Sequence, residues 1–292
     1  MTRLISAVSS ILDEFDVFIL DQWGVLHNGS TPYPSAAAAM NALQSAGKTV
    51  FVLSNSGKRA DLNRTRIAEM GLPVDGVHRV VTSGEALWED LRDGRLLVRE
   101  VTPRRLLVLC GQPQDAERWR DSADWLSVTD HLDDRVDAVL LMGVADGIGE
   151  AHYDEILDAA RQQGLPLICS NPDRRSPRSG GTVISPGALA DRFAGRGGHV
   201  VWYGKPEPAI FRSVLRDCQN TPRDRILMVG DSLEHDVAGA AGLGISSLFV
   251  RGGLHAADFI EGADEATVQA AIDRLVSGRH AVMPDLSVPL FA

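Results

Sequence analysis

The sequence contains little cysteine and no long apolar run. Its 292 residues include three cysteines, namely Cys110, Cys169 and Cys218. An odd number of widely spaced cysteines without a Cys-x-x-Cys pair argues against a disulfide framework and against a zinc site. The apolar run at residues 17–20 is interrupted on its N-terminal side by acidic residues, so it is too short for a signal peptide or a membrane span. We therefore expect a cytoplasmic protein without a membrane partner.

Positive charge is also scarce. The chain has 29 Lys and Arg against 39 Asp and Glu, a formal net charge of -10 at pH 7, and no basic cluster. Because nucleic-acid backbones are bound by clustered Lys and Arg, we expect no nucleic-acid partner. With 44% hydrophobic and 23% charged residues, the composition is that of a globular protein. The length suits one large domain or a core with an inserted second domain.

Four strand-like apolar runs each end in a polar or glycine-containing turn. The runs at 17–20, 49–53, 199–203 and 225–229 lead into Asp21, Ser54-Asn55-Ser56-Gly57, Gly204-Lys205 and Gly230-Asp231. Helix-forming segments separate them, and this alternation predicts an α/β fold with a Rossmann-like parallel sheet covered on both faces. Ligands bind at the carboxyl ends of such strands, so we expect the four turns to converge on one site.

The long stretch between the second and third of these turns contains three further strand-like runs, at 106–110, 138–142 and 165–169. It is far longer than a crossover connection requires, so it predicts an inserted α/β domain. Turn-rich tripeptides flank it at residues 82–84 and 185–187. We therefore expect the insertion to span residues 83–186 and the core to comprise residues 1–82 and 187–292.

The polar residues in these turns suit phosphate chemistry. Asp21 follows a strand directly, where a carboxylate serves as a nucleophile or a metal ligand, or else caps a turn. Ser54 and Asn55 precede a predicted helix, where they would bind phosphate oxygens or act as N-caps. Lys205 stands between a strand and a proline-initiated helix, a stiff setting from which its ammonium group would neutralise a nucleophile and a phosphate. Asp231 and Asp236 offer hard oxygens for Mg²⁺, with helix capping as the alternative.

In this order, the motifs around Asp21, Ser54, Lys205 and Asp231 with Asp236 resemble the four motifs of the haloacid dehalogenase superfamily. The large α/β insertion between the second and third motifs, with Asn171-Pro172-Asp173 at its end, is similar to subclass IIA. That subclass comprises phosphatases of the p-nitrophenyl phosphate, phosphoglycolate and pyridoxal phosphate type. The resemblance covers nearly the whole chain.

The resemblance implies a role for each matched residue. Asp21 would be the nucleophile that forms an aspartyl-phosphate, and Lys205 would balance charge. The remaining roles would be phosphate or substrate binding by Ser54, Asn55, Ser56 and Asp173, and Mg²⁺ binding by Asp21, the main-chain carbonyl of Trp23 and Asp231, with Asp236 in support. The resemblance further implies a cap domain, a substrate that is a small phosphorylated metabolite (a sugar, glycerol or cofactor phosphate), and a homodimer formed through the cap.

Trp23 departs from the family pattern, in which a second aspartate lies two residues after the nucleophile and acts as general acid and base. An indole does not exchange protons at neutral pH, so a contribution of about 100-fold to 10,000-fold is missing from its usual place. His27 is the nearest titratable substitute, or else a bystander in a loop. Two alternatives follow: a weakly active or inactive protein that binds phosphate esters or regulates, or a reaction whose leaving group needs no protonation.

Overall fold

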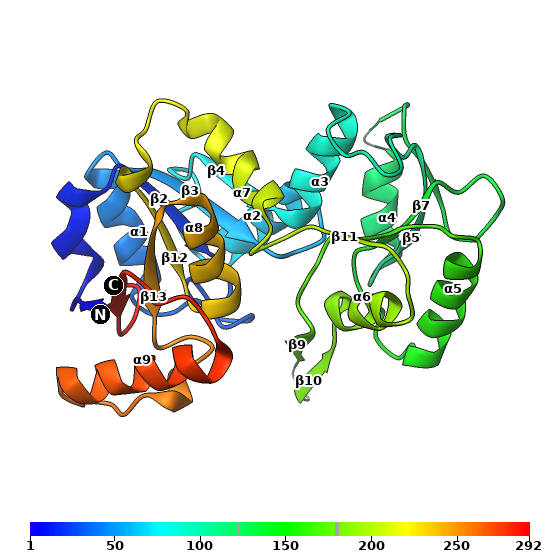
Figure 1. The fold of residues 1–292 in the computed structure, drawn as a ribbon. Helices are drawn as coiled ribbons and strands as arrows, with labels where there is room; N and C mark the ends of the chain where they lie inside the picture. Colours follow the sequence, from blue (N-terminus) through cyan, green and yellow to red (C-terminus); the bar gives the residue numbers. More distant parts are fainter. Residues whose placement is uncertain (122, 179–180) are drawn as a thin grey trace. The chain divides into compact units, whose positions relative to one another are not determined.

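The computed structural model describes residues 1–121, 123–178 and 181–292. They form two compact units (Figure 1). The first unit contains Met1–Ser54, Asn63–Val81 and Phe211–Ala292, and the second contains Asn55–Leu62 and Thr82–Ile210. The second unit thus includes residues 55–62, 82 and 187–210 in addition to the expected insertion at 83–186.

The first unit is built on a seven-stranded sheet within the described residues, in the order β1-β14-β13-β12-β2-β3-β4. The strands are β1 (Arg3–Leu4), β2 (Val17–Asp21), β3 (Thr49–Ser54), β4 (Arg79–Thr82), β12 (Ile226–Gly230), β13 (Ser246–Val250) and β14 (Leu286–Val288). Every residue of β2 and of β12 is buried, as expected for central parallel strands covered on both faces. The central strands β12, β2 and β3 pair in parallel.

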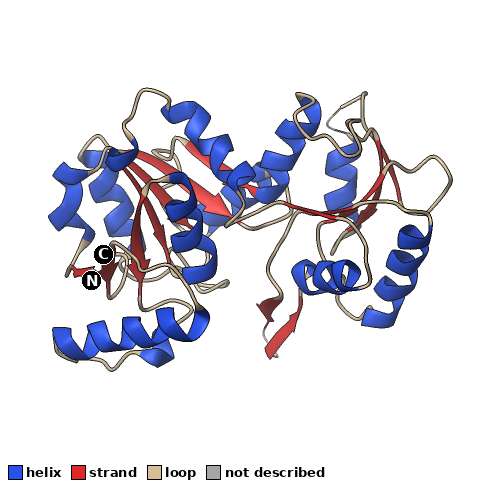
Figure 2. Ribbon diagram, viewed as in Figure 1, coloured by secondary structure: helices blue, strands red, loops and turns tan. Residues whose placement is uncertain are grey.

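Helices pack against this sheet, as Figure 2 shows in blue around the red strands. The α-helices are α1 (Ala36–Ser45), α2 (Ala60–Glu69), α7 (Pro208–Leu215), α8 (Ala238–Leu243) and α9 (Glu265–Arg279), of which α2 and α7 contain residues of both units. Shorter helices are the 3₁₀ turns η1 (Val8–Glu14), η2 (Arg216–Cys218), η3 (Arg223–Arg225) and η5 (Ala256–Asp258), and the π-helical turn η4 (Leu233–Val237). Phe18 and Leu20 of β2 pack with Met40 and Leu43 of α1 in the main core, where each buried side chain contributes about 1.5–3 kcal/mol.

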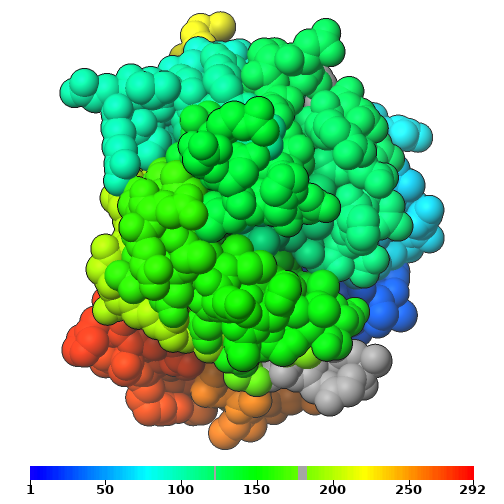
Figure 3. Space-filling view, turned by 90° about the vertical axis from the view of Figure 1, so that its right-hand side faces the viewer, coloured from blue at the N-terminus to red at the C-terminus, as the bar shows by residue number. Residues whose placement is uncertain are grey.

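The second unit has its own parallel sheet, in the order β11-β8-β7-β5-β6. The strands are β5 (Arg105–Leu109), β6 (Ser127–Thr129), β7 (Ala138–Leu141), β8 (Leu167–Cys169) and β11 (Val200–Trp202), and an antiparallel hairpin is formed by β9 (Arg175–Arg178) and β10 (Gly181–Ile184). The helices are α3 (Ser83–Arg92), α4 (Pro113–Arg120), α5 (Glu150–Gln162) and α6 (Pro186–Gly195). The face of this unit that carries α5 is in front in Figure 3, in green.

The α/β fold class with a parallel-strand core is confirmed, but one strand assignment is wrong. Residues 199–203 were expected to form a strand of the same sheet as residues 17–20. Instead β11 pairs with β8, with Val200 opposite Leu167 and Trp202 opposite Cys169. An apolar run next to a parallel sheet pairs with whichever edge the tertiary fold presents, and here that edge is β8.

Among the described residues, no helix combines the length and the hydrophobicity that a membrane span requires.

Candidate active site

Three adjacent strands of the first unit bring polar side chains to one edge of the sheet. Strand β2 lies between β3 and β12, and Asp21 ends β2 opposite Leu53 of β3. Leu20 pairs with Val229 of β12, so Asp231 lies just beyond the same edge. Ser54, the last residue of β3, follows Leu53 there. This is the carboxyl edge, where the order of the strands reverses in the sequence and ligands bind in open α/β sheets.

Asp21, Asp231 and Asp236 form a cluster of carboxylates at this edge. One oxygen from each of the three lies within 4.8 Å of the others. All three residues are buried, with exposed fractions of 8%, 3% and 1%. Three anions in so small a buried volume repel one another unless a cation balances them. Hard carboxylate oxygens are the ligands that Mg²⁺ and Ca²⁺ prefer, so this donor set fits a divalent metal ion.

Two glycines make room for the carboxylate of Asp231. A Cβ atom at either Gly24 or Gly253 would overlap that carboxylate, and Gly24 has a φ of +84°, which also disfavours a side chain there. The main-chain N–H of Leu254 donates to Oδ2 of Asp231 at 2.7 Å. Sequence reasoning identified neither Gly253 nor Leu254, because nothing local to that loop signals its approach to Asp231.

The other two carboxylates are oriented by main-chain N–H groups close in sequence. The N–H of Gln22 donates to Oδ1 of Asp21 at 2.8 Å, which restricts rotation of that carboxylate. The N–H of Ser232 donates to Oδ2 of Asp236 at 3.1 Å. A Cβ atom at Gly230 would overlap the Asp236 side chain, so the glycine before Asp231 permits this close approach. The cluster is therefore held in place before any ligand binds.

Trp23 lies two residues after Asp21 and is 37% exposed, an unusual setting for so large an apolar side chain. Its indole packs beside Gly29, where a Cβ atom would lie 2.7 Å from Nε1. The backbone of Trp23 forms a bridge with His27. The N–H of Gly24 donates to the carbonyl of His27 at 2.9 Å. The loop at residues 23–27, which follows the candidate nucleophile, is therefore held together by its own backbone hydrogen bonds.

His27 is part of the same loop and is only 1% exposed. Its Nδ1 accepts the N–H of Gly29 at 2.9 Å, and its Nε2 lies 3.1 Å from the side-chain amide of Gln22. Nε2 of Gln22 is the atom placed nearest to Nε2 of His27, and Oε1 of Gln22 has no hydrogen-bond partner among the described residues. A neutral imidazole that accepts at Nδ1 carries its proton on Nε2, so turning the Gln22 amide by 180° would let Oε1 accept that proton.

Burial, together with a smaller contribution from the nearby charge of Arg66, lowers the pKa of His27 to about 4. Both ring nitrogens are engaged and the ring stays neutral near pH 7. His27 is therefore suited to stabilising the loop, and its burial argues against His27 as the group that exchanges protons with a substrate.

The buried neutral His27 predicts a pH dependence of stability. Its pKa is about 4 in the folded protein against an ordinary 6.5, so the unfolded chain binds more protons between these values. Stability should therefore fall as the pH drops from about 6.5 to 4, by up to about 3 kcal/mol from this residue. Urea unfolding of His27→Asn should show a shallower decline over that window. The exposed His131→Asn is the control, and equal slopes for the unaltered protein and His27→Asn would contradict this prediction.

The remaining candidate residues belong to the second unit, where three of them form one hydrogen-bonded group. The side chain of Asn55 accepts from the main-chain N–H of Lys205 at 2.7 Å and donates to Asp173 at 2.9 Å. Lys205 is 2% exposed. Ser56 accepts from the N–H of Lys58 at 3.3 Å through its hydroxyl, which forms a serine turn before α2.

The candidate residues thus fall into two groups. Asp21, Trp23, Ser54, Asp231 and Asp236 lie in the first unit, and Asn55, Ser56, Asp173 and Lys205 lie in the second. Asn55 immediately follows Ser54, so the boundary between the units divides the predicted phosphate-binding turn.

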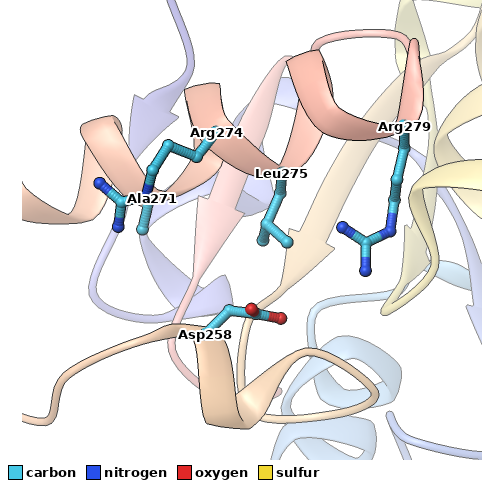
Figure 4. A pocket seen from close by; sticks show the side chains of 5 residues that line it. All are labelled: Asp258, Ala271, Arg274, Leu275 and Arg279. Atoms are coloured by element: carbon cyan, nitrogen blue, oxygen red, sulfur yellow. The ribbon is translucent and has the colours of Figure 1, made fainter.

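A surface cavity of about 220 Å³ also occurs in the first unit, between η5 and α9 (Figure 4). It is lined by Asp258, Ala271, Arg274, Leu275 and Arg279. None of the candidate site residues lines this cavity.

Two family models match the chain. Residues 18–122 match a model described as haloacid dehalogenase-like hydrolase, and residues 202–276 match a second model of HAD-hydrolase-like domains. Chronophin of Mus musculus is 30% identical over 237 residues, which cover 80% of this chain and 79% of chronophin. The chain belongs to the haloacid dehalogenase-like hydrolases. The family predicted from the four motifs is therefore confirmed.

Further comparisons agree with this membership. A haloacid dehalogenase-like hydrolase from Brucella suis 1330 has a similar structure, with a TM-score of 0.76, 28% identity and coverage of 99% of this chain and 100% of that one. The D-glycerol 3-phosphate phosphatase of Mycobacterium tuberculosis is 26% identical over 253 residues, 86% of this chain and 67% of that protein. This haloacid dehalogenase-like hydrolase is thus of subclass IIA, and its Mycobacterium relative is named as a phosphatase.

Proposed function

We propose that this hydrolase is a Mg²⁺-dependent phosphatase of a small phosphorylated metabolite and that it acts through an aspartyl-phosphate at Asp21. The observation that carries the proposal is the buried cluster of Asp21, Asp231 and Asp236 at the carboxyl edge of the sheet. Asp21 ends a fully buried strand, so its carboxylate has a fixed origin. Phosphoryl transfer depends mainly on such positioning and on neutralised charge.

In the proposed reaction an oxygen of Asp21 attacks phosphorus and the bond to the leaving oxygen breaks. Water then releases phosphate from Asp21. Asp21, Asp231 and the main-chain carbonyl of Trp23 would hold Mg²⁺, with Asp236 in support. The bound ion would supply charge neutralisation for the phosphoryl oxygens. We further propose that Ser54 and Ser56 bind the phosphate, that Asp173 contacts the substrate and that Lys205 balances the charge of the phosphate.

The substrate class is proposed from the chemistry of the relatives. The Mycobacterium relative is named for glycerol 3-phosphate, so a glycerol, sugar or cofactor phosphate is our proposed substrate. We also propose that the second unit acts as the cap that sets specificity and that the protein forms a homodimer through it.

One observation favours a second candidate function. Trp23 replaces the expected acid and base, and His27 is buried and neutral, so neither of these two residues of the loop after Asp21 is suited to proton transfer. A protein with this site would bind phosphate esters with little turnover and act as a binding or regulatory protein.

A panel of phosphorylated metabolites separates the two functions. We expect phosphate release in the presence of Mg²⁺ and its loss after chelation with EDTA. Tight binding of esters without release, measured by calorimetry, would favour the binding protein. Neither binding nor release across the panel would reject both.

The metal assignment predicts that Mg²⁺ affinity depends on Asp231. Asp231→Ala removes one hard anionic ligand from the cluster, so the affinity should fall by at least about 10-fold, because few protein oxygens hold the ion. Titration calorimetry with MgCl₂ measures this effect. Asp75→Ala, which removes an exposed carboxylate of the same unit, is the matched control. Unchanged Mg²⁺ affinity in Asp231→Ala would exclude the proposed metal site.

A further inference from the structure

The side chain of Asn55 joins three segments of the second unit that lie far apart in the sequence. Its Oδ1 accepts the main-chain N–H of Lys205 at 2.7 Å, across 150 residues. Its Nδ2 donates to Oδ1 of Asp173 at 2.9 Å, across 118 residues. Asn55 is 8% exposed; its hydrogen bond to Lys205 is buried, and its hydrogen bond to Asp173 is partly buried. Buried hydrogen bonds of this kind are costly to break, because each partner is left without its hydrogen bond.

The turn that carries Lys205 packs directly on the turn that carries Asp173. Gly204 has a φ of +105°, and a Cβ atom there would lie 2.5 Å from Cδ of Pro172 and 2.8 Å from the hydroxyl of Ser83. Only glycine permits both the backbone conformation and this approach. The main chain of Lys205 is therefore confined between Asn55 on one side and the Pro172 turn on the other.

The main chain around Asp173 is held independently of Asn55. Its N–H donates to the side chain of Asn171 at 3.0 Å, and its carbonyl accepts from the N–H of Gly187 at 3.0 Å. The backbone of Asp173 is thus defined by its own loop and by the start of α6. The hydrogen bond from Asn55 adds a constraint on the carboxylate itself.

The segment that presents Asn55 is itself firmly anchored in the second unit. Arg59 forms two hydrogen bonds to Glu85, at 2.7 and 3.0 Å. The hydroxyl of Thr82 donates to the carbonyl of Lys58 at 2.5 Å. The N–H of Gly84 donates to the carbonyl of Ser56 at 3.1 Å. A side chain on so well-anchored a segment is suited to fix the position of its partners.

We propose that Asn55 is a positioning residue, which sets the main chain of Lys205 and the carboxylate of Asp173, and that it is not itself a phosphate ligand. The inference rests on the proposed function, in which Lys205 and Asp173 act on the substrate. The chemistry of the amide explains the residue type. The N–H of Lys205 needs an acceptor and the carboxylate of Asp173 needs a donor, and an amide offers both within one short side chain. Aspartate would keep the acceptor but would place a second carboxylate against Asp173.

A double-mutant cycle tests this role. Asn55→Asp is made in the unaltered protein and in Asp173→Asn, where the exchanged pair restores one donor and one acceptor. In the unaltered background we expect kcat/KM to fall by about 10-fold to 100-fold, because two carboxylates face each other. In the Asp173→Asn background the same change should cost less than about 3-fold. Measuring each effect against its own background removes any separate contribution of Asp173 to substrate binding.

The pattern of kinetic constants distinguishes a positioning role from a ligand role. Mispositioning of Lys205 should lower kcat more than it raises KM, with an unchanged circular dichroism spectrum. A direct phosphate ligand would instead give an equal loss in both backgrounds, mostly in KM, and that result would overturn the inference. If Asn55→Asp does not fold, the cycle of Asn55→Ala with Asp173→Ala replaces it. Non-additive losses then support the inference, and additive losses overturn it.

Failure of the proposed function would be recognised separately. If the unaltered protein releases phosphate from no ester, the cycle is repeated with the affinity for inorganic phosphate as the readout. If Asn55→Asp lowers the affinity for inorganic phosphate in the unaltered background alone, the positioning role is supported. Equal losses in both backgrounds overturn it.

Discussion

Asp21→Asn is expected to lower kcat for phosphate release by at least about 10,000-fold, because an amide oxygen is a poor nucleophile and the covalent route is lost. The substitution is nearly isosteric, and the N–H of Gln22 still finds an acceptor at that position. Single-turnover kinetics with saturating ester would measure the chemical step directly. Retention of more than about 1% of the activity would reject Asp21 as the nucleophile.

The melting temperature of Asp21→Asn distinguishes a catalytic defect from misfolding. Asp21, Asp231 and Asp236 are three buried carboxylates within 4.8 Å of one another, so removing one charge relieves repulsion when no metal is bound. In EDTA the melting temperature of Asp21→Asn should equal or exceed that of the unaltered protein. Asp75→Asn, with an exposed carboxylate, serves as the control for a general effect of charge.

Trp23 predicts that activity depends strongly on the leaving group. An aryl phosphate departs as a stable phenolate, whereas an alkyl phosphate departs as a basic alkoxide that needs a proton. Because an indole does not supply one, aryl esters should be cleaved about 100-fold to 10,000-fold faster. Trp23→Asp should then raise kcat for alkyl esters more than for aryl esters. The measurement is kcat for a series of esters plotted against the pKa of the leaving group, for both proteins.

Trp23→Phe is the matched control, because it keeps an aromatic side chain beside Gly29 and adds no acid. It should leave the dependence on the leaving group steep. Hydrolysis of an alkyl ester by the unaltered protein at roughly 10 per second, a rate typical of enzymes, would contradict this account and require another proton donor. Given the burial of His27, we expect His27→Ala to affect alkyl and aryl esters to the same extent.

The sequence alone was sufficient for the family, the fold class and the carboxylate cluster. Short apolar runs that end in Asp21 and Asp231 specify buried parallel strands, and the carboxyl ends of neighbouring parallel strands necessarily share one edge. Asp231 and Asp236 are only five residues apart, at the start of the helical turn η4, so their proximity is a local property. These features depend on chain-local patterns, which are readable without tertiary contacts.

Other features depend on which distant segments meet, and only the tertiary structure decided them. The run at 199–203 is compatible with either parallel sheet, and it joined the second because β8 presented an unpaired edge to it. Gly253 leaves room for the carboxylate of Asp231 although more than twenty residues separate the two, and no local sequence pattern predicts that contact.

The sequence identifies His27 as a titratable residue in a loop, but burial by its neighbours in the fold keeps its ring neutral. The sequence predicts Asn55 as a phosphate ligand or an N-cap, and its hydrogen bonds to Lys205 and Asp173 depend on the fold. A sequence specifies the residue types that chemistry needs, and long-range packing determines which of them meet, because burial and hydrogen-bond partners are properties of the whole fold.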